Sequence, residues 1–159
     1  MKLHPPEIYQ PDATKRYESI AAQLIQVIPF AKIEHIGSSA IPGALSKADL
    51  DICMIVDSAK LEEVVQTLKH HTYTEKTGTL RTEELCMLEC ALLGNEHAVQ
   101  VVASGSEFEK FFITFRDVLR ARPDLVADYN RIKVDAAELG VEQYREAKSR
   151  FISLVLEDV

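Results

Sequence analysis

The segment at residues 49–56, DLDICMIV, limits the fold of this chain more than any other. Its aliphatic and β-branched residues are typical of a buried strand, along which side chains point alternately to opposite faces of a sheet. One face receives Leu50, Ile52, Met54 and Val56. Asp49 and Asp51 share the other face with Cys53 and Ile55. The segment therefore predicts a strand with one apolar face and two neighbouring carboxylates on the opposite face.

Helical and strand patterns alternate around this segment. Asp12 is a suitable N-cap for a helix that ends before Pro29, because apolar residues recur between them with helical spacing. Residues 31–37, AKIEHIG, predict a short strand that ends at a glycine. A second amphipathic helix opens at residues 57–58, directly after the aspartate strand, and ends near His70.

Two apolar segments in the middle of the chain predict an antiparallel hairpin. They cover residues 84–92 and 97–103 and are separated by Gly94-Asn95, a dipeptide suited to a two-residue loop. With such a loop, Glu89 lies directly opposite Gln100 on the same face of the hairpin.

The last third of the chain is helical by its pattern. Ser104 and Glu107 have the spacing of a capping box, so a helix begins there. Pro123 restarts a second helix, and Gly140 separates it from a third. The sequence thus predicts a single α/β domain over residues 1–159, with a mixed sheet covered by helices and a helical C-terminal segment.

Composition sets bounds on partners and location. The chain of 159 residues is 47% hydrophobic and has a net charge of -7, which disfavours binding of a long nucleic acid because such binding needs lysines and arginines against phosphates. Its three cysteines form no metal or redox motif and are expected to be reduced core residues. No segment approaches the roughly 18 apolar residues of a membrane span. We expect a cytoplasmic protein without a membrane partner.

The residues before the aspartates complete a possible site. Two carboxylates at i and i+2 repel each other unless a cation such as Mg²⁺ lies between them. Upstream, Gly37, Ser38 and Ser39 offer a close backbone approach and two hydroxyls, which suit a phosphate group. Together the features indicate phosphoryl or nucleotidyl transfer. Taken singly, each has a plainer reading, in which the aspartates are solvated edge residues and the glycine marks a simple turn.

The same residues resemble a known signature. Gly37-Ser38 followed by residues 49–52, DLDI, resembles the nucleotidyltransferase superfamily shared with DNA polymerase beta. The whole chain resembles GrpB-like proteins of that superfamily in four stretches that occur in the right order. These are HIGSSAIPGALSKADLDI at residues 35–52, HAVQVVASGS at 97–106, FRDVLRARPDLVADYNRIK at 115–133 and YREAKSRFI at 144–152.

The resemblance implies roles for most of these residues. Gly37, Ser38 and Ser39 would hold nucleotide phosphates, and Asp49 and Asp51 would hold Mg²⁺ or Mn²⁺. Superfamily enzymes usually add a third carboxylate on a later strand.

The position of that third carboxylate departs from the superfamily pattern. Gln100 stands in the corresponding segment, where family members often carry histidine, and glutamine cannot serve as a base. Glu89 could supply the missing carboxylate if the hairpin register places it opposite Gln100.

A triphosphate also requires basic partners. Lys47, just before the aspartates, is the nearest candidate, and His35 adjoins the Gly-Ser turn. Arg116 and Lys148 match positions that recur in the family. Arg120 lies one helical turn after Arg116, although it could equally be a solvated residue of the helix surface.

These features give a leading functional expectation and two alternatives. We expect magnesium-dependent binding of a nucleoside triphosphate, with transfer of a nucleoside monophosphate to an acceptor of unknown identity. The second reading is an inactive nucleotide-sensing or interaction module of the same fold, which Gln100 favours. The third is hydrolysis of a phosphate ester at the same metal site.

Overall fold

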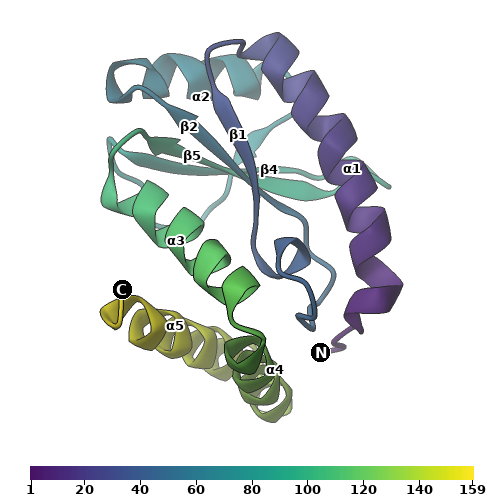
Figure 1. The fold of residues 1–159 in the computed structure, drawn as a ribbon. Helices are drawn as coiled ribbons and strands as arrows, with labels where there is room; N and C mark the ends of the chain where they lie inside the picture. The colour runs from purple at the N-terminus through teal and green to yellow at the C-terminus, as the bar shows by residue number, and fades with distance from the viewer.

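The sheet of the computed structural model, which describes all of residues 1–159, has five strands in the order β1-β2-β5-β4-β3 (Figure 1). Their bounds are β1 Lys32–Ile36, β2 Asp51–Val56, β3 Thr74–Glu75, β4 Leu85–Cys90 and β5 His97–Ala103. The central pair β2–β5 is parallel, and all other pairs are antiparallel. The mixed sheet expected from the sequence is confirmed.

Helices cover this sheet in unequal layers (Figure 1). The bounds are α1 Pro6–Val27, α2 Leu61–Lys69, α3 Glu107–Ala121, α4 Pro123–Ala137 and α5 Val141–Glu157. α1 and α2 pack on one face of the sheet, and α3 packs on the other. α4 and α5 pack on α3 from the outside. None of the helices combines the length and the apolar character that crossing a membrane requires.

The alternation expected along the aspartate strand is present in the structure. Leu50, Ile52, Met54 and Val56 belong to the core beneath α1 and α2. Cys53 and Ile55 belong to the smaller cluster beneath α3. The strand begins at Asp51 rather than Asp49, so only the second aspartate is part of the sheet ladder.

The first helix begins earlier than predicted. It starts at Pro6, and Asp12 lies inside it rather than at its cap. The added turns are held by contacts to the loop after β1, where the Tyr9 hydroxyl donates to the Ala44 carbonyl at 2.8 Å and the Gln10 amide donates to the Ile41 carbonyl at 2.8 Å. Such long-range contacts override the local start signal.

The hairpin register also differs from the prediction. β4 and β5 are joined by residues 91–96, a longer loop that contains a turn closed by the Asn95 N–H on the Leu92 carbonyl at 2.9 Å. As a result Gln100 pairs with Met87, and Glu89 pairs with Ala98. The shift is two residues, so Glu89 keeps the predicted face because side chains alternate with a period of two.

Two further details correct the sequence reading. The N-cap of α3 is Ser106, whose hydroxyl accepts from the Glu109 N–H at 3.3 Å, so the cap lies two residues after Ser104. The short strand β3 has no counterpart among the predicted elements.

Candidate functional site

The loop that joins β1 to β2 begins with a glycine that touches the second aspartate. Gly37 has a φ of 76°, a left-handed value that favours glycine. A Cβ atom at this position would lie 2.8 Å from Asp51 Oδ2. The backbone of Gly37 therefore packs directly against the Asp51 carboxylate, and a side chain at residue 37 would displace it.

Two adjoining cavities meet at the aspartates. The inner cavity, about 180 Å³, lies between the end of the sheet and α3, α4 and α5. Its polar lining consists of Gly37, Ser38, Ser46, Lys47, Asp49, Asp51, Gln100 and Lys148, with the aromatic residues Phe111, Phe112, Phe115, Tyr129 and Tyr144 around them. The structure thus brings together, in one cavity, most of the residues that the sequence singled out.

The outer cavity, about 420 Å³, opens toward β3 and β4. Its charged lining consists of Arg16, Lys47, Asp49, Asp51, Lys76, Glu89 and Glu96. Lys47, Asp49 and Asp51 line both cavities, so the aspartate pair is the boundary between them.

The two aspartates have different surroundings. Asp49 is exposed and its carboxylate lies 3.7 Å from Lys47 Nζ. Asp51 is half-buried, and burial, followed by the negative charge of Asp49, raises the pKa of its carboxyl. The nearby Lys148 charge acts in the opposite direction. A cation between the carboxylates would relieve their repulsion.

Two carboxylates are a donor set that Mg²⁺ commonly uses in proteins. No third histidine, cysteine, aspartate or glutamate joins the pair in a group arranged to hold a metal ion. Mg²⁺ commonly binds through one or two carboxylates and takes its remaining ligands from substrate phosphates and water. The pair alone therefore does not complete a metal site. It suits Mg²⁺ or Mn²⁺ that takes its other ligands from outside the protein.

A buried lysine that the sequence analysis missed contacts Ser38, one of the residues that line the inner cavity. Lys133 of α4 is fully buried, and its ammonium donates to Ser38 Oγ at 3.2 Å and to the Leu45 carbonyl. It also lies 4.1 Å from the ring centroid of Tyr129. Burial, followed by the charge of Lys148, lowers the pKa of Lys133 to about 7. The only sequence signal was its place at the end of the stretch FRDVLRARPDLVADYNRIK.

Lys148 of α5 lines the inner cavity. Its ammonium is 5.4 Å from the ring centroid of Tyr144, and burial lowers its pKa although Asp51 counteracts this shift. Lys148, predicted as a phosphate ligand, thus lines the cavity that Asp49 and Asp51 also line.

Two predicted phosphate ligands face away from the cavities. His35 points to the α1 side of the sheet, where its ring stacks on Tyr17 at a centroid distance of 4.6 Å and shares a 2.8 Å hydrogen bond with Ser39 Oγ. Burial, followed by the charges of Arg120 and Arg116, lowers the pKa of His35 to about 4, so the ring is neutral at pH 7. His35 and Ser39 therefore stabilise the turn and do not reach a phosphate in either cavity.

The predicted arginines are also committed to structural contacts. Arg116 is buried, donates to Glu34 at 2.7 Å, to Asp117 at 2.9 Å and to the His35 carbonyl at 3.0 Å, and lines neither cavity. Arg120 donates to the Ala40 carbonyl at 2.8 Å. Arg116 and Arg120 are four residues apart and therefore lie on the same face of α3. From this face they bond α3 to β1 and to the turn that follows it.

Gln100 and Glu89 line different cavities. Gln100 lines the inner cavity, and its side-chain carbonyl oxygen is buried without a hydrogen-bond partner. Glu89 lines the outer cavity together with both aspartates. The structure thus brings Glu89 to the site although the predicted register was wrong.

Comparisons with known proteins identify the family and the fold of the chain. The family described as GrpB protein matches residues 7–158. A UPF0157 protein of Vibrio cholerae serotype O1 is 46% identical over 156 residues, which cover 98% of this chain and 82% of the relative. The crystal structure of the conserved protein GrpB from Enterococcus faecalis has a TM-score of 0.74 at 20% identity and covers 98% of this chain and 99% of its own.

A more distant likeness concerns the fold alone. The Cid1 poly(U) polymerase in its MgGTP-bound crystal structure has a TM-score of 0.55 at 14% identity, with 82% of this chain matched to 42% of Cid1. The fold is therefore nucleotidyltransferase-like, as the resemblance in the sequence implied. Since the family match extends over almost the whole length, the chain belongs to the GrpB family.

Proposed function

We propose that the chain binds a nucleoside triphosphate together with Mg²⁺ and transfers a nucleoside monophosphate to an acceptor. The observation that carries the proposal is the contact between Gly37 and Asp51 at a cavity that also holds Ser38, Lys47 and Lys148. The nucleotidyltransferase-like fold supports the same class of reaction.

In this proposal the phosphates occupy the inner cavity. The backbone of Gly37 and the hydroxyl of Ser38 bind phosphate oxygens, while Lys47 and Lys148 offset their charge. Asp49 and Asp51 would hold the magnesium ion, which would supply electrostatic stabilisation of the developing negative charge. Lys133 keeps Ser38 in place from behind.

The acceptor enters through the outer cavity. Its hydroxyl or amine gives a proton to Glu89 and forms a bond to the α-phosphorus, as the bond from that phosphorus to the bridging oxygen breaks and pyrophosphate leaves. Glu89 is the carboxylate of this cavity that does not belong to the aspartate pair or to the hairpin loop.

A second candidate function follows from Gln100. It places at the site a neutral amide that cannot serve as a base, which suits nucleotide binding without chemistry. The protein would then be a nucleotide sensor or interaction module.

Binding is tested by thermal unfolding with each of the four nucleoside triphosphates, with and without Mg²⁺. A ligand at 100 times its dissociation constant should stabilise the folded state by about 2.7 kcal/mol. We expect one nucleotide to do so in the wild type only with Mg²⁺, and to lose the effect in Asp49→Asn/Asp51→Asn. Asp135→Asn, an exposed carboxylate of α4, is the matched control. Equal behaviour of the two variants would refute the metal-dependent site.

Turnover then separates the three readings. A transferase releases pyrophosphate only when an acceptor is present, whereas a hydrolase acts with water alone and a sensor releases nothing. For a transferase, Glu89→Gln should slow pyrophosphate release by about 100-fold or more without changing the nucleotide-dependent stabilisation.

We also propose the cytoplasm as the compartment. All three cysteines are free and buried, as expected for thiols in a reducing environment. The acceptor would then be a cytoplasmic molecule rather than a membrane component, and the net charge of -7 disfavours a long nucleic acid.

A further inference from the structure

The outer cavity contains two cations that have no carboxylate partner. Arg16 comes from α1 and Lys76 follows β3, and neither forms an ion pair. The third cation of the cavity, Lys47, is already paired with Asp49. Two charges in the cavity are therefore available to a ligand.

Arg16 is held in place but incompletely bonded. One terminal nitrogen of its guanidinium donates to the Glu96 carbonyl at the rim of the cavity. Its Nε atom is buried and has no hydrogen-bond partner. The Nε atom is thus covered by the protein itself, and a ligand in the cavity would meet the terminal nitrogens. The other terminal nitrogen, Nη1, makes no hydrogen bond, so it can donate to an oxygen of a carboxylate or phosphate in the cavity that Arg16 lines.

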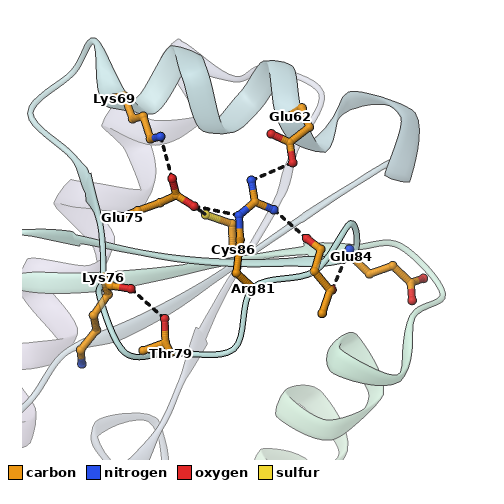
Figure 2. A network of polar contacts seen from close by, with 9 residues as sticks. Glu62, Lys69, Glu75, Lys76, Thr79, Arg81, Glu84 and Cys86 are labelled. Carbon is orange, nitrogen blue, oxygen red and sulfur yellow. Dashed lines mark hydrogen bonds and ion pairs between the residues drawn. The ribbon is translucent and has the colours of Figure 1, made fainter.

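The Lys76 ammonium has no carboxylate partner, because the adjacent Glu75 carboxylate is bonded to other side chains. The Glu75 carboxylate accepts from Lys69 at 2.7 Å, from Arg81 at 2.8 Å and from the Cys86 thiol at 3.2 Å. These bonds lower the pKa of Glu75 to about 2. Figure 2 shows the Lys76 ammonium pointing away from this network.

The backbone of Lys76 is nevertheless fixed. Its N–H donates to the Met87 carbonyl at 2.8 Å, and its carbonyl accepts from the Thr79 hydroxyl at 2.8 Å. Figure 2 shows that the Thr79 bond closes the loop after Lys76. The structure thus holds the base of the side chain while leaving its charge free at the outer cavity.

The outer cavity has space for a ligand beside the aspartates. Phosphates held by Gly37 and Ser38 in the inner cavity leave the outer cavity open on the other side of the aspartate pair. Glu89 lines that side, and Glu96 is turned to its own loop, where its carboxylate accepts from the Gly94 N–H at 3.0 Å. A volume of about 420 Å³ suits a small molecule.

We propose that the acceptor is a small molecule bearing a carboxylate or phosphate group, which Arg16 and Lys76 bind, and a hydroxyl or amine that faces Glu89 and the aspartates. The assignment rests on the proposed function. It narrows the acceptor to a small anionic molecule that contains a nucleophile.

The test follows anion binding at Arg16 directly by NMR. In ¹⁵N-labelled protein saturated with Mg²⁺ and a non-hydrolysable nucleotide, the Nε–Hε signal of Arg16 is monitored during titration with glycerol 3-phosphate, glycerate and glycerol. The two anions differ in their charged group, and glycerol lacks one. We expect a saturable shift with at least one anion and none with glycerol.

Matched variants locate the bound anion. Arg16→Gln and Lys76→Gln should each weaken binding of that anion by about tenfold or more, measured on the remaining cavity signals. Lys15→Gln, an exposed neighbour of Arg16 on α1, should leave it unchanged. Preference for glycerol 3-phosphate or for glycerate identifies the phosphate or the carboxylate as the recognised group.

The outcomes separate this inference from the function on which it rests. If nucleotide moves the Gly37 and Ser38 amide signals but both anions leave Arg16 unmoved, the anionic acceptor is wrong and nucleotide binding stands. If glycerol shifts Arg16 as the anions do, the cavity does not recognise charge and the inference is overturned. If no nucleotide moves Gly37 or Ser38, the proposed function fails, and the acceptor assignment fails with it.

Discussion

The two faces of the sheet are packed in different ways. Beneath α1 and α2, one continuous cluster of 19 buried residues closes the face with apolar side chains. Beneath α3, the apolar residues divide into separate clusters of 8 and 5, and Arg116 and Lys133 are buried on the same side. The candidate site also lies on this second side. The comparison indicates that one face mainly stabilises the fold and the other holds the charged groups of the site.

The largest expected effect comes from the continuous core. Leu88 on β4 is fully buried in the 19-residue cluster, so Leu88→Ala should lower the free energy of unfolding by about 2–5 kcal/mol, measured by denaturant titration. Leu85 on the same strand faces α3 and lines an apolar cavity of about 490 Å³, so fewer contacts are lost when it is shortened. Leu85→Ala should therefore cost less, and equal losses would contradict the contrast between the faces.

Lys133 makes the second face sensitive to pH. Its pKa falls from 10.5 to about 7 on folding, so between these pH values the unfolded chain binds more protons and the stability of the folded chain rises with pH. In Lys133→Met the side chain does not titrate, so this contribution to the rise of stability with pH is lost. The stability of the variant relative to the wild type should therefore fall by about 2 kcal/mol between pH 7 and pH 9.

Thermal unfolding at a series of pH values measures this difference. Lys15→Met, at an exposed position on α1, should show no such trend. A stability difference that is independent of pH would mean that Lys133 stays charged in the folded protein.

A substitution at Gly37 tests whether the contact of its backbone with the Asp51 carboxylate is needed for nucleotide binding. Gly37→Ala should cost about 1–3 kcal/mol, because its φ of 76° and ψ of -176° lie in a region that is almost restricted to glycine. The new Cβ should also displace Asp51 and abolish nucleotide-dependent stabilisation. Gly43→Ala is a matched control, because Gly43 has a φ of 88° but a Cβ there would meet only Val126 at 3.6 Å. Loss of the nucleotide response in both variants would show that strain, not the Asp51 contact, is responsible.

The smallest effect is expected at an exposed ion pair. Arg150 and Glu146 lie one turn apart on α5 with a distance of 3.4 Å between charged atoms. Because both are solvated, a double-mutant cycle with Arg150→Ala and Glu146→Ala should give a coupling energy of about 0.3–0.5 kcal/mol. A coupling above about 1 kcal/mol would show that charge outside the site also matters for stability.

The strand alternation and the aspartate pair could be predicted from the sequence because they depend on neighbouring residues. The period of two in residues 49–56 is a local property, and the order of apolar and polar residues is enough to assign the faces. The same holds for α2, whose buried residues Leu61, Val64, Val65 and Leu68 recur at helical spacing.

The features that were missed depend on contacts between distant segments. α1 extends to Pro6 because Tyr9 and Gln10 bond to the loop after β1, and no neighbour in sequence indicates this. Lys133 resembles an ordinary helix lysine until α4 is packed against Ser38. The direction in which His35 points was predictable from strand alternation, but its proximity to the Gly-Ser turn suggested a role in the site.

The parallel pairing of β2 with β5 has a consequence for the order of folding. The hairpin β4–β5 joins segments that are close in the chain. Pairing of Asp51 on β2 with Ala98 on β5 instead closes a long loop that contains α2, β3 and β4. Closing so long a segment is entropically costly, and contacts between distant residues slow folding. We therefore expect Gln100 and Glu89 to meet the aspartates late, so that a nascent chain ending before β5 would contain Gly37 and Asp51 without a complete binding site.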